Sequence, residues 1–303
     1  MKTRAPALVV FAFAPVLVSG ASCKPDFAER DSLVTEERVL AMQAEPAEAK
    51  PGTAISYSLL VASPNGTVQN AGADWAFCTT PSSLTENDSV SPDCLKDGVA
   101  EIGSAGEETS AATPGDACSI FGPDTPPGQI RPRDADATGG FFQPVRAEIG
   151  SIVAFGFARI TCDLPNAPAS VTIDFNERYV ANRNPAPPVI SASVAGASVD
   201  FASIPANARV TFRATWTADD AESFVVYDPS SVSVVDARES IRVSWFASGG
   251  SFDADRTGRD ASDTTTFTEN GWAAPSSGIV HLWVVMRDSR GGVSFAGADL
   301  TVK

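Results

Sequence analysis

The stretch VHLWVVMRDSRGGVSFAGADLTV, residues 280–302, shows the pattern that decides the fold. Its first half places apolar residues two apart, which is the period of a strand that buries one face. The residues that share this face are Val280, Leu282, Val284 and Met286. Residues 288–292, DSRGG, then supply turn-forming side chains, and residues 293–302 return as a second strand. The stretch therefore predicts an antiparallel hairpin.

The same alternation recurs upstream and predicts two sandwiches of short antiparallel strands. In the C-terminal half, further strand signals lie at residues 189–195, 209–217, 231–235 and 241–247. In the N-terminal half they lie at residues 38–44, 55–61, 73–78, 141–149 and 152–161. A sustained helical period of 3.6 residues is not found, so the fold class is all-β.

The sequence NPAPP, residues 184–188, separates the two groups of strands and favours an extended, stiff connection. We therefore expect one domain over residues 38–184 and another over residues 185–303. Just before the boundary, residues 170–182 fit two interpretations. Val171, Phe175 and Tyr179 are spaced four apart as in a short helix, and Val171, Ile173 and Phe175 alternate as in a strand.

Residues 79–140 form a long span inside the first domain that is rich in Ser, Thr, Asp, Gly and Pro. Its length predicts either a functional insertion or a disordered segment. Four cysteines lie in or beside it, an even number that predicts two disulfides in an oxidising compartment. They are Cys78, Cys94, Cys118 and Cys162.

The pairing of these cysteines depends on how the strands are ordered. If strands 73–78 and 152–161 are antiparallel neighbours, Cys78 and Cys162 lie at opposite ends of the sheet. This reasoning favours Cys78 with Cys94 and Cys118 with Cys162, but all three connectivities stay open. In each of them, the insertion at residues 79–140 is stapled by disulfides.

Residues 1–22 have the features of a secretory signal peptide: two cations, a short apolar run and small residues. The apolar run contains two prolines and is too short to span about 30 Å of hydrocarbon. Gly20-Ala21-Ser22-Cys23 resembles a bacterial lipoprotein box, although Gly20 replaces the usual aliphatic residue. We therefore expect lipidation of Cys23, followed by a tether over residues 23–37. The alternative is cleavage after Ala21, which leaves Cys23 as a thiol.

A lipid on Cys23 would anchor the chain to a membrane. Lys24 in the next position is typical of lipoproteins sorted to the outer membrane, so the expected location is the cell envelope.

The chain has 22 basic and 37 acidic residues, and its formal net charge is −15. Phosphate backbones repel such a chain, which disfavours nucleic acid as a partner.

The C-terminal half resembles the bacterial immunoglobulin-like modules of the PKD and cadherin-like kind over most of residues 188–303. The residues that carry this resemblance are 244–250 (SWFASGG), 271–275 (GWAAP) and 284–292 (VVMRDSRGG). Ser248-Gly249-Gly250 stands where PKD modules usually have Gly-Asp-Gly. The resemblance implies that the C-terminal sandwich is immunoglobulin-like. Residues 51–59 and 75–77 echo residues 205–213 and 245–246, and this faint repeat extends the expectation to the first sandwich.

The N-terminal half looks like a group of uncharacterised bacterial envelope lipoproteins. The resemblance is in residues 38–41 (RVLA), 45–46 (EP), 51–52 (PG), 75–78 (WAFC) and 160–162 (ITC). It implies an envelope location and no particular activity.

Residues 253–260, DADRTGRD, form the best candidate metal site. Alternating carboxylates with a glycine at the sixth position are typical of a loop that binds Ca²⁺. The candidate ligands are Asp253, Asp255 and Asp260, whereas neighbouring arginines also fit a solvated Asp–Arg turn. Apart from Ca²⁺, no cofactor is expected.

Catalytic patterns are weak in this sequence. His281 is the one histidine, and its place within a strand favours a surface residue over a catalytic triad. The tryptophans lie in apolar strand patterns, which favours core packing over a sugar-stacking platform. They are Trp75, Trp216, Trp245, Trp272 and Trp283.

Together these features predict an exported, lipid-anchored envelope protein that is not an enzyme. We expect a binding or structural module whose loops contact a protein or polysaccharide at the cell surface. The alternatives are a carbohydrate-active hydrolase that uses the 79–140 insertion, or a Ca²⁺-dependent adhesin.

Overall fold

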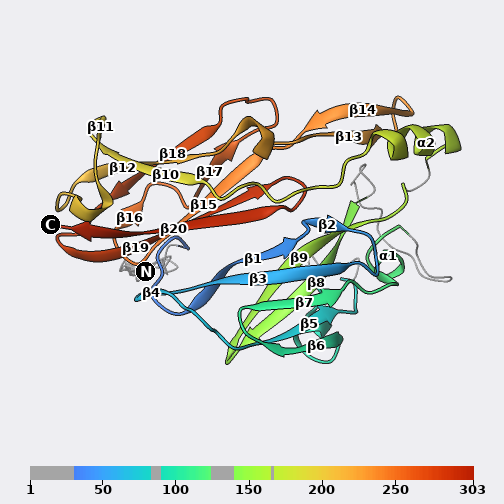
Figure 1. The fold of residues 1–303 in the computed structure, drawn as a ribbon, viewed down its shortest axis with the longest axis horizontal. Coiled ribbons are helices and arrows are strands. Elements are labelled where there is room, and N and C mark those ends of the chain that lie inside the picture. The colour runs from blue at the N-terminus through green and yellow to red at the C-terminus, as the bar shows by residue number, and fades with distance from the viewer. Residues whose placement is uncertain (1–30, 83–89, 124–139, 165–166) are drawn as a thin grey trace, which may run out of the picture. The chain divides into compact units, whose positions relative to one another are not determined.

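The N-terminal strands form two sheets that pack face to face (Figure 1). The structure is a computed structural model that describes residues 31–82, 90–123, 140–164 and 167–303. One sheet has the order β1-β3-β4, with β7 also paired to β3, and the other has the order β2-β9-β8-β5-β6. Their bounds are β1 (Arg38–Glu45), β2 (Glu48–Ala49), β3 (Ala54–Ser63), β4 (Gly66–Thr67), β5 (Ala73–Cys78), β6 (Val99–Ala105), β7 (Glu108–Ala112), β8 (Gly140–Ile149) and β9 (Ile152–Thr161).

The core of this first sandwich follows from the alternation in its sequence. On β3, Ile55, Tyr57 and Leu59 are buried on one face. They meet Trp75 and Phe77, which point inward from β5 in the opposite sheet. Because alternate residues of a strand face opposite sides, two short runs of apolar residues are enough to fill the space between the sheets.

The span from residue 79 to residue 140 contributes to both sheets of the first sandwich. Within it, β6 pairs with β5 and β7 pairs with β3, so each sheet gains an edge strand. The same span holds a 3₁₀ turn, η1 (Pro92–Leu95), and a short helix, α1 (Ala117–Ile120). The described part of the insertion is therefore built into the sandwich.

Two disulfides staple this span, Cys78 to Cys94 and Cys118 to Cys162. The favoured pairing is the one observed, but the strand order assumed for it was wrong. β8 lies between β5 and β9 and is antiparallel to both, so β5 and β9 run in the same direction. Cys78 and Cys162 therefore follow the same ends of their strands, and strand direction alone does not separate them.

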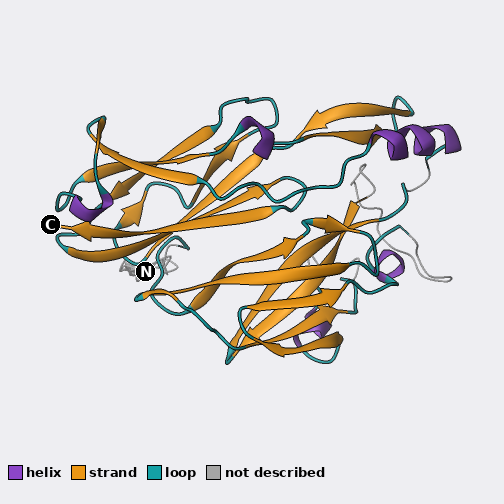
Figure 2. Cartoon of the chain, viewed as in Figure 1, coloured by secondary structure: helices purple, strands orange, loops and turns teal. Residues whose placement is uncertain are grey.

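The C-terminal strands form a second sandwich, in agreement with the predicted hairpin and fold class (Figure 2). Its sheets have the orders β11-β10-β12-β18-β16 and β17-β15-β19-β20. The bounds are β10 (Val189–Val194), β11 (Ala197–Ser198), β12 (Arg209–Thr215), β15 (Ile241–Ala247), β16 (Ser251–Phe252), β17 (Arg256–Arg259), β18 (Phe267–Ala273), β19 (Gly278–Asp288) and β20 (Val293–Val302). Two 3₁₀ turns, η2 (Phe201–Ser203) and η3 (Ala218–Asp220), lie in its loops.

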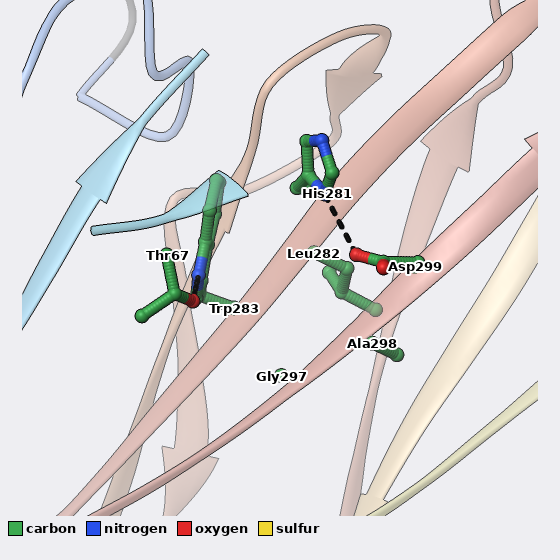
Figure 3. A pocket seen from close by; sticks show the side chains of 7 residues that line it. All are labelled: Thr67, His281, Leu282, Trp283, Gly297, Ala298 and Asp299. Carbon is green, nitrogen blue, oxygen red and sulfur yellow. Dashed lines mark hydrogen bonds and ion pairs between the residues drawn. The ribbon is translucent and has the colours of Figure 1, made fainter. Parts of the chain in front are cut away.

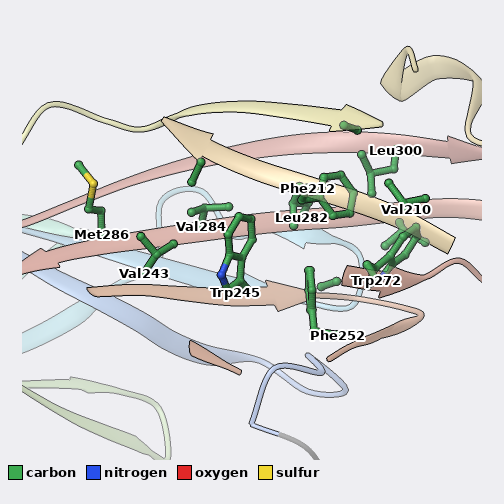
Figure 4. Packing of buried hydrophobic residues seen from close by; sticks show 14 of the residues in the cluster. Val210, Phe212, Val243, Trp245, Phe252, Trp272, Leu282, Val284, Met286 and Leu300 are labelled. Carbon is green, nitrogen blue, oxygen red and sulfur yellow. The ribbon is translucent and has the colours of Figure 1, made fainter. Parts of the chain in front are cut away.

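Aromatic residues fill the core of the second sandwich (Figure 4). Phe212 on β12 packs with Trp272 and Phe252, whose ring centroids are 5.6 and 6.1 Å from its own. Trp245 on β15 closes the cluster from the opposite sheet. These tryptophans are fully buried, so they pack the core as predicted.

A helix lies between the two sandwiches in the sequence, and a separate hairpin lies between β12 and β15 of the second sandwich. Residues 170–182, which fitted both helix and strand, form the helix α2 (Ala169–Arg178) in their first part. Its buried residues Val171 and Phe175 pack with Val225 and Tyr227 of the hairpin β13 (Ser223–Asp228) and β14 (Ser233–Arg238).

The two sandwiches pack against each other within one compact unit, Asp31–Lys303. Trp283 and Val285, on the outer face of β19, contact an apolar group of the first sandwich that includes Leu40 and Leu60. The indole nitrogen of Trp283 also donates to the hydroxyl of Thr67 at 2.8 Å. Among the described residues, no helix has the length and apolar character needed to cross a bilayer.

Candidate functional site at the junction of the two sandwiches

A buried carboxylate, Glu48 of β2, begins a polar network that links the two sandwiches. The side chain is fully buried, and its Oε2 lies 3.1 Å from Nε of Arg159 on β9. Thr161 donates its hydroxyl to Oε1 at 2.9 Å, and Tyr179 donates to both oxygens at 2.7 and 2.8 Å. The backbone N–H of Asn182 donates to Oε2 at 2.9 Å. Such dense bonding compensates the cost of burying a charge.

Asn182 carries the network from the first sandwich to the second. Its side-chain amide donates to the carboxylate of Asp288, which ends β19, at 3.2 and 3.4 Å. Asp288 in turn accepts the backbone N–H groups of Arg290 and Gly292 at 2.8 and 2.9 Å. Asn182, in the segment that follows α2, thus ties the first sandwich to the predicted hairpin turn of the second.

Arg290, at the tip of that turn, closes the network. Its Nε donates to Glu239 at 2.6 Å, and its Nη2 donates to Glu222 at 2.7 Å. Nη1 donates to the carbonyl of Val180 at 2.8 Å, and the guanidinium lies over the ring of Phe224, 4.6 Å from its centroid. One planar cation therefore joins the connecting segment, the base of the β13–β14 hairpin and the β19–β20 turn.

Burial sets the protonation of these groups. Burial and the nearby Asp288 carboxylate raise the pKa of Glu239 to about 7, against the attraction of Arg290. Burial also raises the pKa of Asp288, although backbone N–H groups oppose it. Burial is the main reason that the pKa of Tyr179 rises to about 12, and the Glu48 carboxylate raises it further. The Tyr179 hydroxyl therefore stays protonated and remains a donor. The junction is therefore sensitive to pH near neutrality.

The geometry of this site is that of a clamp between domains. The ion pairs lie within one sandwich each, and Asn182 of the connecting segment joins them by donating to both Glu48 and Asp288. Separating the sandwiches would therefore leave one of these buried carboxylates without that donor. The sequence predicted the turn at residues 288–292 and the connection at residues 184–188. It gave no sign of Glu48, Glu222 or Glu239, because isolated glutamates far apart in sequence resemble ordinary surface residues.

His281 lies beside a pocket of about 290 Å³ where β4 meets β19 and β20 (Figure 3). Its Nδ1 is 2.7 Å from Oδ1 of Asp299, and its ring centroid is 6.0 Å from that of Trp283. The hydroxyl of Ser248 accepts the backbone N–H of His281 at 2.9 Å, and so contacts the main chain rather than the ring. The histidine is thus hydrogen-bonded to Asp299, with 19% of its side chain exposed.

The structure does not bring the candidate Ca²⁺ ligands together. The four residues of β17 separate Asp255 from Asp260, and an extended strand of that length spans about 13 Å. Asp253 instead forms an ion pair with Arg209. Among the described residues, no group of three or more His, Cys, Asp or Glu side chains is placed to hold a metal ion. A buried amide, Asn270, holds this loop through its hydrogen bonds with Ala254 at 2.6 and 3.3 Å.

The tryptophans and the predicted lipidation site are the remaining residues that the sequence singled out. All five tryptophans are buried, Trp216 being the most accessible at 6%, so none forms an exposed platform for a sugar ring. The predicted lipidation site Cys23 and the leader before it lie outside the described residues.

Comparison with known proteins found no matching family model and no matching curated protein. Among solved structures, the chain is similar to the D0-D1 domain of intimin, with 10% identity, a TM-score of 0.23, and coverage of 87% of this chain and 98% of that one. The fibronectin(III)-like modules of Clostridium thermocellum CbhA match with 10% identity, a TM-score of 0.23, and coverage of 90% and 92%. Invasin, a bacterial integrin-binding protein, matches with 10% identity, a TM-score of 0.21, and coverage of 88% and 39%. Scores this low carry no argument about function.

Proposed function

We propose that the protein is an exported cell-envelope module that holds two immunoglobulin-like sandwiches in a fixed arrangement, and that it acts by binding or by structural support rather than by catalysis. The buried junction of Glu48, Asn182 and Arg290 is the observation that supports this proposal. A flexible pair of domains would have no need for a buried polar network at their connection, since burying Glu48, Asp288 and Arg290 is costly unless every partner stays in place.

The export part of the proposal has a separate basis. Disulfides persist in oxidising compartments, and this chain forms two of them, at Cys78–Cys94 and Cys118–Cys162. The sequence of residues 1–22 supports secretion, and the lipoprotein box before Cys23 supports an acyl anchor. The outer membrane is the location we propose, with the folded domains reached by a protein or polysaccharide ligand.

Expression of the full chain and of the Cys23→Ala variant in a Gram-negative host tests export and anchoring. We expect the wild type to incorporate radioactive palmitate and to sediment with the outer membrane. The variant should incorporate none and should be released with the soluble periplasmic fraction, with both disulfides still formed. Unlabelled wild-type protein in the cytosol with free thiols would contradict the proposal.

A further inference from the structure

The strands β17, β15 and β19 are neighbours in that order in one sheet (Figure 1). Each of them carries an arginine on the outer face of this sheet. Arg242 of β15 is directly opposite Arg287 of β19. Arg256 of β17 is directly opposite Ser244, two residues along β15 from Arg242. Because opposed residues share a face, and so do alternate residues of one strand, the three arginines leave the sheet on the same side.

These arginines lack the carboxylate partners that most arginines of the described chain have. Arg213, for example, is 2.7 Å from Glu269, whereas Arg242, Arg256 and Arg287 form no ion pair with any described residue. Arg287 donates to the carbonyl of Leu40 at 3.2 Å, which fixes its guanidinium beside β1. Burial and the guanidinium groups of Arg256 and Arg242 lower the pKa of Arg287. The three cations are therefore close enough to repel one another.

Three neighbouring arginines without carboxylate partners destabilise the sheet unless an anion neutralises their charge. Like charges directly opposite each other on neighbouring strands are unfavourable. The chain has 37 acidic residues against 22 basic ones, so carboxylates are plentiful, yet none of the described ones pairs with this cluster. A destabilising feature of this kind is characteristic of functional sites, where a bound ligand supplies the opposite charge that the fold lacks.

We propose that Arg242, Arg256 and Arg287 form a binding site for a small anion that carries phosphate groups. Three guanidinium groups offer many more N–H donors than a single carboxylate can accept, and a phosphate presents more oxygens and more charge. The outer two of three adjacent strands are about 10 Å apart, which suits a diphosphate reached by side chains from both. The site is separate from the junction clamp, so it does not depend on the function proposed above.

The overall acidity of the chain decides which sources of phosphate suit the site. A net charge of −15 repels polyanions at long range and so disfavours nucleic acid and anionic membrane surfaces. A small ligand is screened from that field and feels mainly the local arginines. Compounds with a soluble phosphate or diphosphate group therefore fit better than a lipid headgroup.

Calorimetric titration with inorganic pyrophosphate tests the site on the Cys23→Ala chain, which carries no acyl group. We expect one site per chain, and affinity about tenfold weaker or more in Arg242→Gln and in Arg256→Gln. The matched control is Arg213→Gln, another exposed strand arginine, which should bind as the wild type does. Without ligand, Arg242→Gln should melt at the same temperature as the wild type or higher, because a repulsion is removed.

The outcomes separate clearly. The proposal is overturned if pyrophosphate does not bind, or if Arg242→Gln and Arg256→Gln bind it as tightly as the control. Co-sedimentation with vesicles of phosphatidylglycerol, compared with phosphatidylcholine, identifies the source. Binding to pyrophosphate but not to vesicles supports a soluble ligand, and sedimentation that requires Arg242 supports a lipid headgroup for the same site.

Discussion

At the scale of single residues, Arg290 has the greatest effect on the junction, because its three nitrogens hold three different segments. Replacing Arg290 with Met keeps much of the side-chain volume but leaves the Glu222 and Glu239 carboxylates without their buried cation. We expect Arg290→Met to lower the free energy of unfolding by about 3–5 kcal/mol. Urea denaturation of the two proteins measures this difference.

The matched comparison for Arg290 is an exposed ion pair. Arg213 and Glu269 face solvent on the second sandwich, with about half of each side chain accessible. Arg213→Met should therefore cost less than about 1 kcal/mol. If Arg290→Met lowered the free energy of unfolding no more than Arg213→Met does, the buried ion pairs would be no stronger than a surface pair. The interpretation of the junction as a clamp would then be wrong.

Glu239 gives the junction a dependence on pH. Its pKa is raised from 4.5 to about 7 in the folded protein, chiefly by burial and then by Asp288. Between these values the folded state binds a proton that the unfolded state has lost, so the stability from this group is complete below about pH 4.5 and is lost as pH rises through 7. We expect the free energy of unfolding to fall by up to about 3 kcal/mol over this range.

The variant Glu239→Gln isolates this contribution, because the amide cannot ionise but can still accept from Arg290. Its free energy of unfolding should change less than that of the wild type between about pH 5 and about pH 8. The difference between the two curves removes the effect of every other titrating group except the coupled Asp288. Parallel curves would show that Glu239 is ionised throughout the range.

At the scale of elements, the two disulfides fix different parts of the 79–140 span. The Cys118–Cys162 bond closes 44 residues of sequence and holds α1 against the end of β9, and the Cys78–Cys94 bond closes 16. Loop-closure entropy predicts a loss of about 4 kcal/mol for Cys118→Ala/Cys162→Ala and about 3 kcal/mol for Cys78→Ala/Cys94→Ala. Urea denaturation of each double variant provides the measurement, and a loss below about 1 kcal/mol in either would contradict it.

The elements also show how far the sequence could predict this fold. Strands with apolar alternation, such as β3 and β19, were predicted close to their bounds. β18 was missed because two of its inward-facing residues, Thr268 and Asn270, are polar and interrupt the alternation. β13 was missed because it follows an acidic loop and packs on α2 rather than on a sheet.

The junction was beyond prediction for a different reason. Its acidic residues, Glu48, Glu222, Glu239 and Asp288, span most of the chain and share no local pattern. The fold of the second sandwich brings three of them together, and the segment around Asn182 links them to Glu48. The arginine cluster was partly predictable. Strand register places Arg242 opposite Arg287, so a correct pairing of β15 with β19 would have predicted that these two arginines are neighbours.

At the scale of the whole molecule, the clamp and the apolar contact at Trp283 act together, so we expect the sandwiches to keep one arrangement in solution. Nitroxide labels at Glu108→Cys on β7 and Glu269→Cys on β18, in a Cys23→Ala background, report on this because both sites are exposed and lie on different sandwiches. Pulsed electron resonance should give a single narrow distance distribution, since buried contacts restrict the domains.

Trp283→Ala should broaden that distribution, because it removes an indole that is 2% exposed and its hydrogen bond to Thr67. The matched control is Ile279→Ala on the same strand, whose side chain is 68% exposed and contributes little to packing. A distribution already broad in the unsubstituted chain would mean that the domains move independently. In that case water would have to reach the buried charges of the junction from time to time. A fixed spacing between two binding surfaces could then no longer explain why the chain keeps these buried charges.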